Sequence, residues 1–249
     1  MPRWLAASAE ALRAAERWLL PGHCLLCQER AGGGAGDPLV CPLCRSRWTR
    51  LPFPQCPRCG QPTDADTECR VCREWPPEFS GVASAVWMEP SARRAVHLLK
   101  YEGWHRITEA MAAPMAGLAP VAGGGLLVPI PLGAARLQTR GYNQSGTLAR
   151  AVGHLAGNPV AEAALVRIRD TRTQTTLTPE ERDANLRGAF RVVGALPARV
   201  VLVDDVFTTG ATLVSAARAL LEGGARAVTA VTFARAELPL AAISRINSH

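Results

Sequence analysis

From about Gly81 onward, short apolar runs alternate with stretches that have helical spacing. The apolar runs at residues 82–87, 126–130, 200–203 and 228–233 predict buried strands, because each is brief and contains Val or Ile. Helical periodicity or capping residues predict helices at residues 91–101, 107–118, 143–156 and 213–222. Strands that alternate with helices predict an α/β fold in which helices flank a parallel sheet.

The first 80 residues follow a different pattern. Leu5, Leu12 and Leu19 recur at helical spacing and predict an amphipathic helix over residues 1–22. Residues 23–78 are rich in Cys, Pro and Gly and lack periodicity, which favours a small module held together by metal. Pro76 and Pro77 mark a boundary. We therefore expect an N-terminal helix, a cysteine-rich module and a larger α/β domain over residues 81–240.

The overall composition adds little to this picture, whereas the charge of the chain is informative. The 249-residue chain is 48% hydrophobic and 20% charged, as is usual for globular proteins. The net charge is +7 and Lys100 is its single lysine, so arginine carries the positive charge. This bias has two interpretations, GC-rich codons or phosphate handling. No apolar run of about 18 residues and no signal peptide are apparent, so we expect a cytoplasmic protein that does not insert into membranes.

Eight cysteines form four C-x-x-C pairs between Cys24 and Cys72. A C-x-x-C turn brings two thiolates to one metal, and in a reducing compartment such pairs indicate zinc rather than disulfides. Four thiolates leave no open coordination position, so the zinc would be structural. An iron–sulfur cluster, or the loss of one site, is the alternative. The spacing permits sequential or crossed pairing of the four C-x-x-C turns. Sequential pairing gives two sites, Cys24, Cys27, Cys41 and Cys44 in the first and Cys56, Cys59, Cys69 and Cys72 in the second.

A basic cluster with one aromatic residue lies inside this module, at Arg45, Arg47, Trp48 and Arg50. It is either a solvated face or a contact patch for nucleic acid.

The segment "VVLVDDVFTTGATL" at residues 200–213 contains the densest candidate chemistry. In parallel sheets, ligands lie at the carboxyl ends of strands, and here the predicted strand ends on Asp204 and Asp205. The Thr- and Gly-rich residues that follow can form an anion cradle at a helix N-terminus. Adjacent carboxylates would repel a phosphate, so sugar hydroxyls or magnesium are their expected partners. The pattern predicts a ligand with a phosphate next to a ribose. It is not a P-loop, and an acidic turn before a capped helix is the alternative.

The same segment resembles the phosphoribosyl pyrophosphate (PRPP) motif of type I phosphoribosyltransferases. The whole chain is similar to the ComF family of competence-related and GntX-like proteins. "LLKYEG", "VPIPLGAARLQTRGYNQS" and "RDTRTQTTLTPEERDANLRGAF" also resemble segments of that family. The resemblance implies a double zinc ribbon followed by a type I phosphoribosyltransferase-like domain.

The resemblance also implies roles for individual residues. Asp204 and Asp205 would bind the ribose hydroxyls, and magnesium would accompany PRPP. Arg136, Arg140 and Gly141 would meet pyrophosphate, with Lys100 at the same edge. A flexible hood would contain Arg172, Gln174, Arg182 and Asn185. The 5-phosphate would be held by Thr208, Thr209, Gly210, Ala211 and Thr212.

Two functional hypotheses follow. The first is an enzyme that transfers ribose 5-phosphate to a nitrogen nucleophile and releases pyrophosphate; the sequence does not identify the acceptor. The second is a non-catalytic protein of DNA uptake that binds a nucleotide or single-stranded DNA and contacts the uptake machinery. The excess of positive charge over residues 81–249, with 18 basic and 12 acidic residues, fits either hypothesis.

Overall fold

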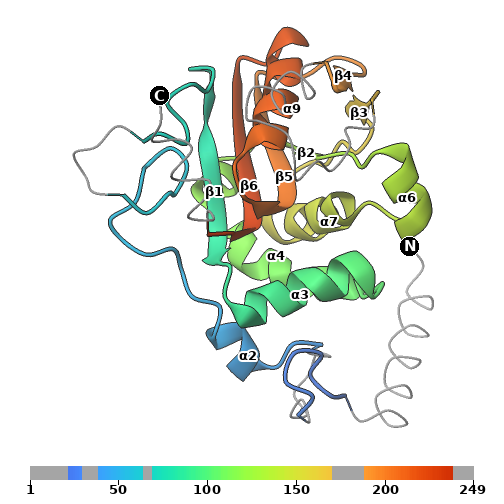
Figure 1. Cartoon of the computed structure of the whole chain (residues 1–249). Helices are drawn as coiled ribbons and strands as arrows, with labels where there is room; N and C mark the ends of the chain where they lie inside the picture. Colours follow the sequence, from blue (N-terminus) through green and yellow to red (C-terminus); the bar gives the residue numbers. More distant parts are fainter. Residues whose placement is uncertain (1–21, 30–38, 64–68, 170–187, 238–249) are drawn as a thin grey trace.

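The computed structural model describes residues 22–29, 39–63, 69–169 and 188–237. Its centre is a four-stranded parallel sheet in the order β1-β6-β5-β2 (Figure 1). The strands are β1 (Phe79–Trp87), β2 (Leu126–Pro129), β5 (Arg199–Phe207) and β6 (Ala227–Arg235). The predicted parallel sheet is confirmed, and β1 and β2 form its edges.

Helices cover one face of this sheet. α3 (Pro90–Tyr101), α4 (Thr108–Ala116) and α7 (Gln144–Ala156) bury a shared apolar core against it. α7 begins where the Asn143 side chain accepts a hydrogen bond from the Ser145 amide, and it ends at Gly157 in the left-handed region. The short helices η1 (His105–Ile107) and α5 (Ala119–Ala122) flank α4.

The opposite face is covered by α9 (Ala211–Glu222) and a small antiparallel pair of strands, β3 (Leu165–Arg167) and β4 (Phe190–Val192). Leu213 and Leu220 of α9 pack with Val200 and Leu202 of β5 in the second apolar core. Because both faces are covered, most residues of β5 and β6 are buried, and burial does not alternate along these strands.

The cysteine-rich module wraps around the edge strand β1 (Figure 1). The Val82 amide donates to the Arg58 carbonyl and the Trp87 amide donates to the Thr49 carbonyl, each at 2.8 Å. The first cysteine cluster packs into the core beneath α3, and the second packs into the core on the α9 face. The module therefore covers an edge that would otherwise expose unpaired backbone groups.

Most predicted elements are present, but several of their bounds differ. β5 continues through both aspartates to Phe207, so the strand does not end on them, and α9 begins at Ala211 rather than at residue 213. Residues 134–140, for which no helix was predicted, form the helix α6 (Ala134–Arg140). The expected N-terminal helix lies outside the described residues. Within those residues, no helix combines the length and the apolar character needed to cross a bilayer.

Candidate functional site

The two acidic residues of β5 are held by helices from one face of the sheet. The Ser145 hydroxyl, in the first turn of α7, donates to Asp204 Oδ1 at 2.8 Å. The Asp205 amide donates to the same oxygen at 2.9 Å. Asp204 is thereby oriented by two donors, one local and one that only the fold supplies.

Asp205 is a buried carboxylate with 3% of its surface exposed. Lys100, in the last turn of α3, brings Nζ to 2.8 Å from Asp205 Oδ2. The contact is a short ion pair, and a carboxylate oxygen with one cationic neighbour can accept a further hydrogen bond. The buried charge is therefore compensated, but Oδ2 can still accept a donor.

The electrostatic environment distinguishes the two carboxylates. Burial raises the pKa of Asp204 to about 7, and the charge of Asp205 adds to this rise. Lys100, the Ser145 hydroxyl and the Asp205 amide oppose the rise. Near neutral pH, Asp204 can therefore accept or release a proton, as adjacent acids in a buried site commonly do.

The residues after β5 turn sharply into α9. Thr208 and Thr209 are exposed, and Gly210 precedes the helix with φ +84°. Ala211 and Thr212 are the first two helical residues, so their backbone amides lie at the positive end of the helix dipole. We call residues 208–212 the TTGAT loop. The expected anion cradle at this loop stays a prediction.

The predicted basic residues come from two further elements at this edge. Arg136 and Arg140 lie on α6, and Gly141 ends that helix with φ +76°. The Arg140 guanidinium lies 5.3 Å from the centre of the Tyr101 ring, next to Lys100 in α3. Arg140, Lys100 and the aspartates are thus brought into one neighbourhood from separate elements. The predicted hood residues Arg172, Gln174, Arg182 and Asn185 lie outside the described residues.

Two residues that the sequence analysis did not assign also belong to this neighbourhood. Ser145 holds Asp204, and Tyr142 donates its hydroxyl to the Leu99 carbonyl on α3. Burial raises the pKa of the Tyr142 hydroxyl, and the charge of Asp205 raises it further while Arg140 lowers it. Both residues fall within the family-like segment "GYNQS", so that segment was the available clue.

The eight cysteines form two sites with sequential pairing. In each site the four sulfurs lie within 4.8 Å of one another: Cys24, Cys27, Cys41 and Cys44 in site I, and Cys56, Cys59, Cys69 and Cys72 in site II. Four sulfurs bound to one zinc ion are about 3.8 Å apart, because each Zn–S bond is about 2.3 Å. Sulfur pairs here are 3.5–3.9 Å apart. Amides of Leu26 and Cys41 also donate to Cys24 Sγ at 3.4 and 3.3 Å, as suits a thiolate ligand.

The chain is similar to known proteins over most of its length. Residues 15–73 match a family model described as a double zinc ribbon domain. The chain is 33% identical over 220 residues to the DNA utilization protein YhgH of Salmonella typhimurium and of Escherichia coli, covering 84% of this chain and 95% of each relative. It is 28% identical over 209 residues to the competence protein ComFC of Bacillus subtilis, covering 80% of this chain and 85% of that protein.

The chain belongs to the ComF family. In this ComF chain, a double zinc ribbon with two four-cysteine sites for structural zinc precedes a four-stranded parallel sheet. Among solved structures, the orotate phosphoribosyltransferase from Aeropyrum pernix aligns with 66% of the ComF chain and 84% of its own, with 16% identity and a TM-score of 0.33.

Proposed function

We propose that this protein binds PRPP together with magnesium at the carboxyl end of β5, and that it serves DNA uptake or utilization. One observation carries the binding proposal. Two adjacent carboxylates, held from α3 and α7, are followed within five residues by a left-handed glycine that starts a helix. A phosphorylated ribose requires carboxylates that accept hydrogen bonds from its hydroxyls and, beside them, backbone amides that bind its phosphate.

The ligand-binding roles follow from position. Asp204 and Asp205 would accept hydrogen bonds from the ribose hydroxyls, because each carboxylate oxygen can accept more than one hydrogen bond. The TTGAT loop would hold the 5-phosphate through backbone amides and the exposed hydroxyls of Thr208 and Thr209.

Cationic residues would hold the other end of the ligand. Arg136, Arg140 and Lys100 would meet the pyrophosphate, with Gly141 allowing close approach. Magnesium, where it binds with the ligand beside Asp204 and Asp205, would supply positive charge that stabilises the leaving group. The hood residues Arg172, Gln174, Arg182 and Asn185 would exclude water from the reacting carbon.

In the finer form of the proposal the protein is a transferase. The bond between C1 of the ribose and pyrophosphate breaks, and a new bond forms to a nitrogen nucleophile, which then loses a proton. The cations stabilise the departing pyrophosphate, and the aspartates keep the ribose in place.

Calorimetry with PRPP and magnesium tests the binding proposal. We expect saturable binding by the wild type and a loss of at least tenfold in affinity for Asp204→Asn combined with Asp205→Asn. Glu162→Gln, a change in an exposed ion pair with Arg150 of α7, is the matched control and should bind as the wild type does. Pyrophosphate release in the presence of a panel of bases and amines then tests transfer. Binding without release would support a non-catalytic nucleotide-binding protein.

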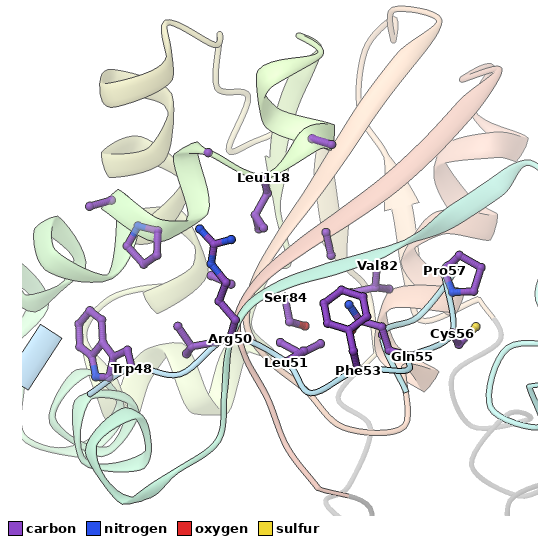
Figure 2. A pocket seen from close by; sticks show the side chains of 18 of the residues that line it. Trp48, Arg50, Leu51, Phe53, Gln55, Cys56, Pro57, Val82, Ser84 and Leu118 are labelled. Atoms are coloured by element: carbon purple, nitrogen blue, oxygen red, sulfur yellow. The ribbon is translucent and has the colours of Figure 1, made fainter. Parts of the chain in front are cut away.

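A groove beside β1 favours a second function, the binding of single-stranded DNA. It has a volume of about 770 Å³ and lies between β1, the residues after α2 (Pro42–Ser46) and the helices α4 and α5. Arg45, Arg50 and Phe53 line it, and 82% of the Phe53 surface is exposed. Figure 2 shows Arg50 extending toward Leu118 across this groove. Cationic groups with an exposed aromatic ring suit phosphates and stacked bases.

Fluorescence anisotropy with a labelled single-stranded oligonucleotide tests this second function. Phe53→Ala should weaken binding by about 1–3 kcal/mol if a base stacks on the ring. Arg45→Ala with Arg50→Ala should reduce the slope of affinity against salt concentration by about two. Arg226→Ala removes an exposed arginine before β6 and should leave binding unchanged. Equal losses in all three variants would exclude the groove as the binding surface.

A further inference from the structure

Site II is tied rigidly to the start of the sheet. Arg58 lies between its first two ligands in sequence. The Arg58 guanidinium donates to the carbonyls of Cys72, Pro76 and Phe79 at 2.9, 2.6 and 2.9 Å. The Arg58 carbonyl accepts the amide of Val82 in β1. The ligand loops of site II and the entry into β1 therefore form one hydrogen-bonded unit.

Trp75 extends this unit to the TTGAT loop. The Trp75 amide donates to the carbonyl of the ligand Cys72 at 3.2 Å, and its ring centre lies 6.0 Å from that of Phe207. A Cβ added to Gly210 would lie 2.7 Å from Phe207 Cε2 and 2.9 Å from Trp75 Cζ2. The backbone of Gly210 thus packs directly against these two rings. Displacement of Trp75 would leave only the Phe207 ring in contact with it on this side.

Arg235 provides a second connection, between site II and Phe207. Its side chain is fully buried, and its guanidinium lies 4.1 Å from the centre of the Phe207 ring. It donates to Gln61, two residues beyond the ligand Cys59. Its Nε and Nη1 have no hydrogen-bond partner within the described part of the chain. A cation buried in this way costs several kcal/mol unless a negative charge lies near it.

Site II adjoins Arg235 through Gln61, which follows the ligand Cys59 in the same loop. Burial lowers the pKa of the Arg235 guanidinium, and the charges of the site II cysteines oppose this change. A zinc ion with four thiolates carries a net charge of about −2, which compensates a guanidinium without requiring a direct hydrogen bond. Arg235 therefore connects the ligand loop of site II, through Gln61, to the Phe207 ring against which Gly210 packs.

We propose that site II positions the TTGAT loop through Trp75 and Arg235, so that its zinc occupancy sets the order of this loop and its affinity for a phosphorylated ligand. The affinity part rests on the proposed function, whereas the ordering of the loop does not. Site I packs beneath α3 on the other face of the sheet, where Ser91 Oγ donates to the Cys44 carbonyl at 3.5 Å. Site I therefore provides a built-in comparison.

The experiment compares one ligand substitution in each site. Cys69→Ser in site II and Cys27→Ser in site I each replace the partly exposed ligand of a site. Zinc content, hydrogen exchange of the peptide that covers the TTGAT loop, and PRPP affinity are measured for the full chain. We expect Cys69→Ser to lose one zinc, to exchange the loop amides at least tenfold faster and to bind PRPP at least tenfold more weakly. Cys27→Ser should lose one zinc and change neither of the other quantities more than twofold.

Trp75→Phe keeps all eight ligands and removes the part of the ring that supports Gly210. It should retain two zinc ions, leave hydrogen exchange in β6 unchanged and accelerate hydrogen exchange in the TTGAT loop. This variant tests the positioning of the loop even if Cys69→Ser does not fold. The proposal is overturned if Trp75→Phe leaves loop exchange unchanged, or if the two cysteine variants alter it equally. If the wild type binds no PRPP, the proposed function fails, while the exchange comparison still tests positioning.

Discussion

The replacement of Asp204 by asparagine should stabilise the ligand-free protein while it weakens ligand binding. Oδ1 of Asp204 accepts hydrogen bonds from Ser145 and from the Asp205 amide, and an asparagine oxygen can accept both. What the substitution removes is a carboxyl group whose ionisation is penalised by burial and by Asp205. Sites that bind charged ligands often sacrifice stability in this way.

The pH dependence follows from the difference between the two states. The pKa of Asp204 is about 7 in the folded protein and about 3.9 in the unfolded chain. Between these values the folded protein holds a proton that the unfolded chain has released, so wild-type stability falls as pH rises toward 7 and then levels off. An asparagine side chain at this position does not titrate, so the advantage of Asp204→Asn should be partial at pH 5 and full at pH 8.

The raised pKa of Asp204 also limits how much the stability gain of Asp204→Asn can change with pH. A pKa held near 7 allows at most about 3 kcal/mol between pH 5 and pH 8, at about 1.4 kcal/mol for each pH unit. The side chain of Asp204 keeps some contact with the surface, and solvent access reduces the expected gain to about 1–2 kcal/mol.

Urea unfolding at pH 5 and pH 8, followed by circular dichroism, measures this difference. Asp205→Asn is the contrasting variant, because it removes the counter-charge of Lys100 and should destabilise the protein at both pH values. The reasoning is refuted if Asp204→Asn is less stable than the wild type at pH 8, or if its advantage does not grow with pH.

Three further predictions concern backbone, charge and metal. Gly210→Ala should cost more than about 2 kcal/mol in chemical unfolding, because its Cβ would collide with aromatic carbons, whereas Gly194→Ala, at a similar φ but in open space, should cost only about 1 kcal/mol. Lys100→Met should leave Asp205 buried without a counter-charge, which we expect to lower the thermal midpoint and to weaken PRPP binding in calorimetry; an unchanged midpoint would contradict the ion pair. Chelation of zinc should broaden or lower the unfolding transition, because both cysteine sites belong to the apolar cores, and transitions identical with and without metal would contradict a structural role.

The sequence by itself determined the features that depend on local spacing. A C-x-x-C turn places two thiols within reach of one metal, and four such pairs occur here, so the zinc sites were predictable, although their pairing was not. The alternation of apolar runs and helices likewise predicted the parallel sheet. The "VDDVFTTGAT" segment predicted the acids, the turn and the helix start to within two residues, since strand, turn and cap are encoded by neighbouring residues.

Only the tertiary structure decided which distant groups meet. Nothing in the sequence pattern indicates that Lys100 neutralises Asp205, because that contact depends on how α3 packs across the sheet. The same holds for the hydrogen bond that Arg235 donates to Gln61, because these two residues are 174 positions apart in the sequence. Such contacts form because helices and strands must bury their apolar faces, and the polar groups carried along must then find partners.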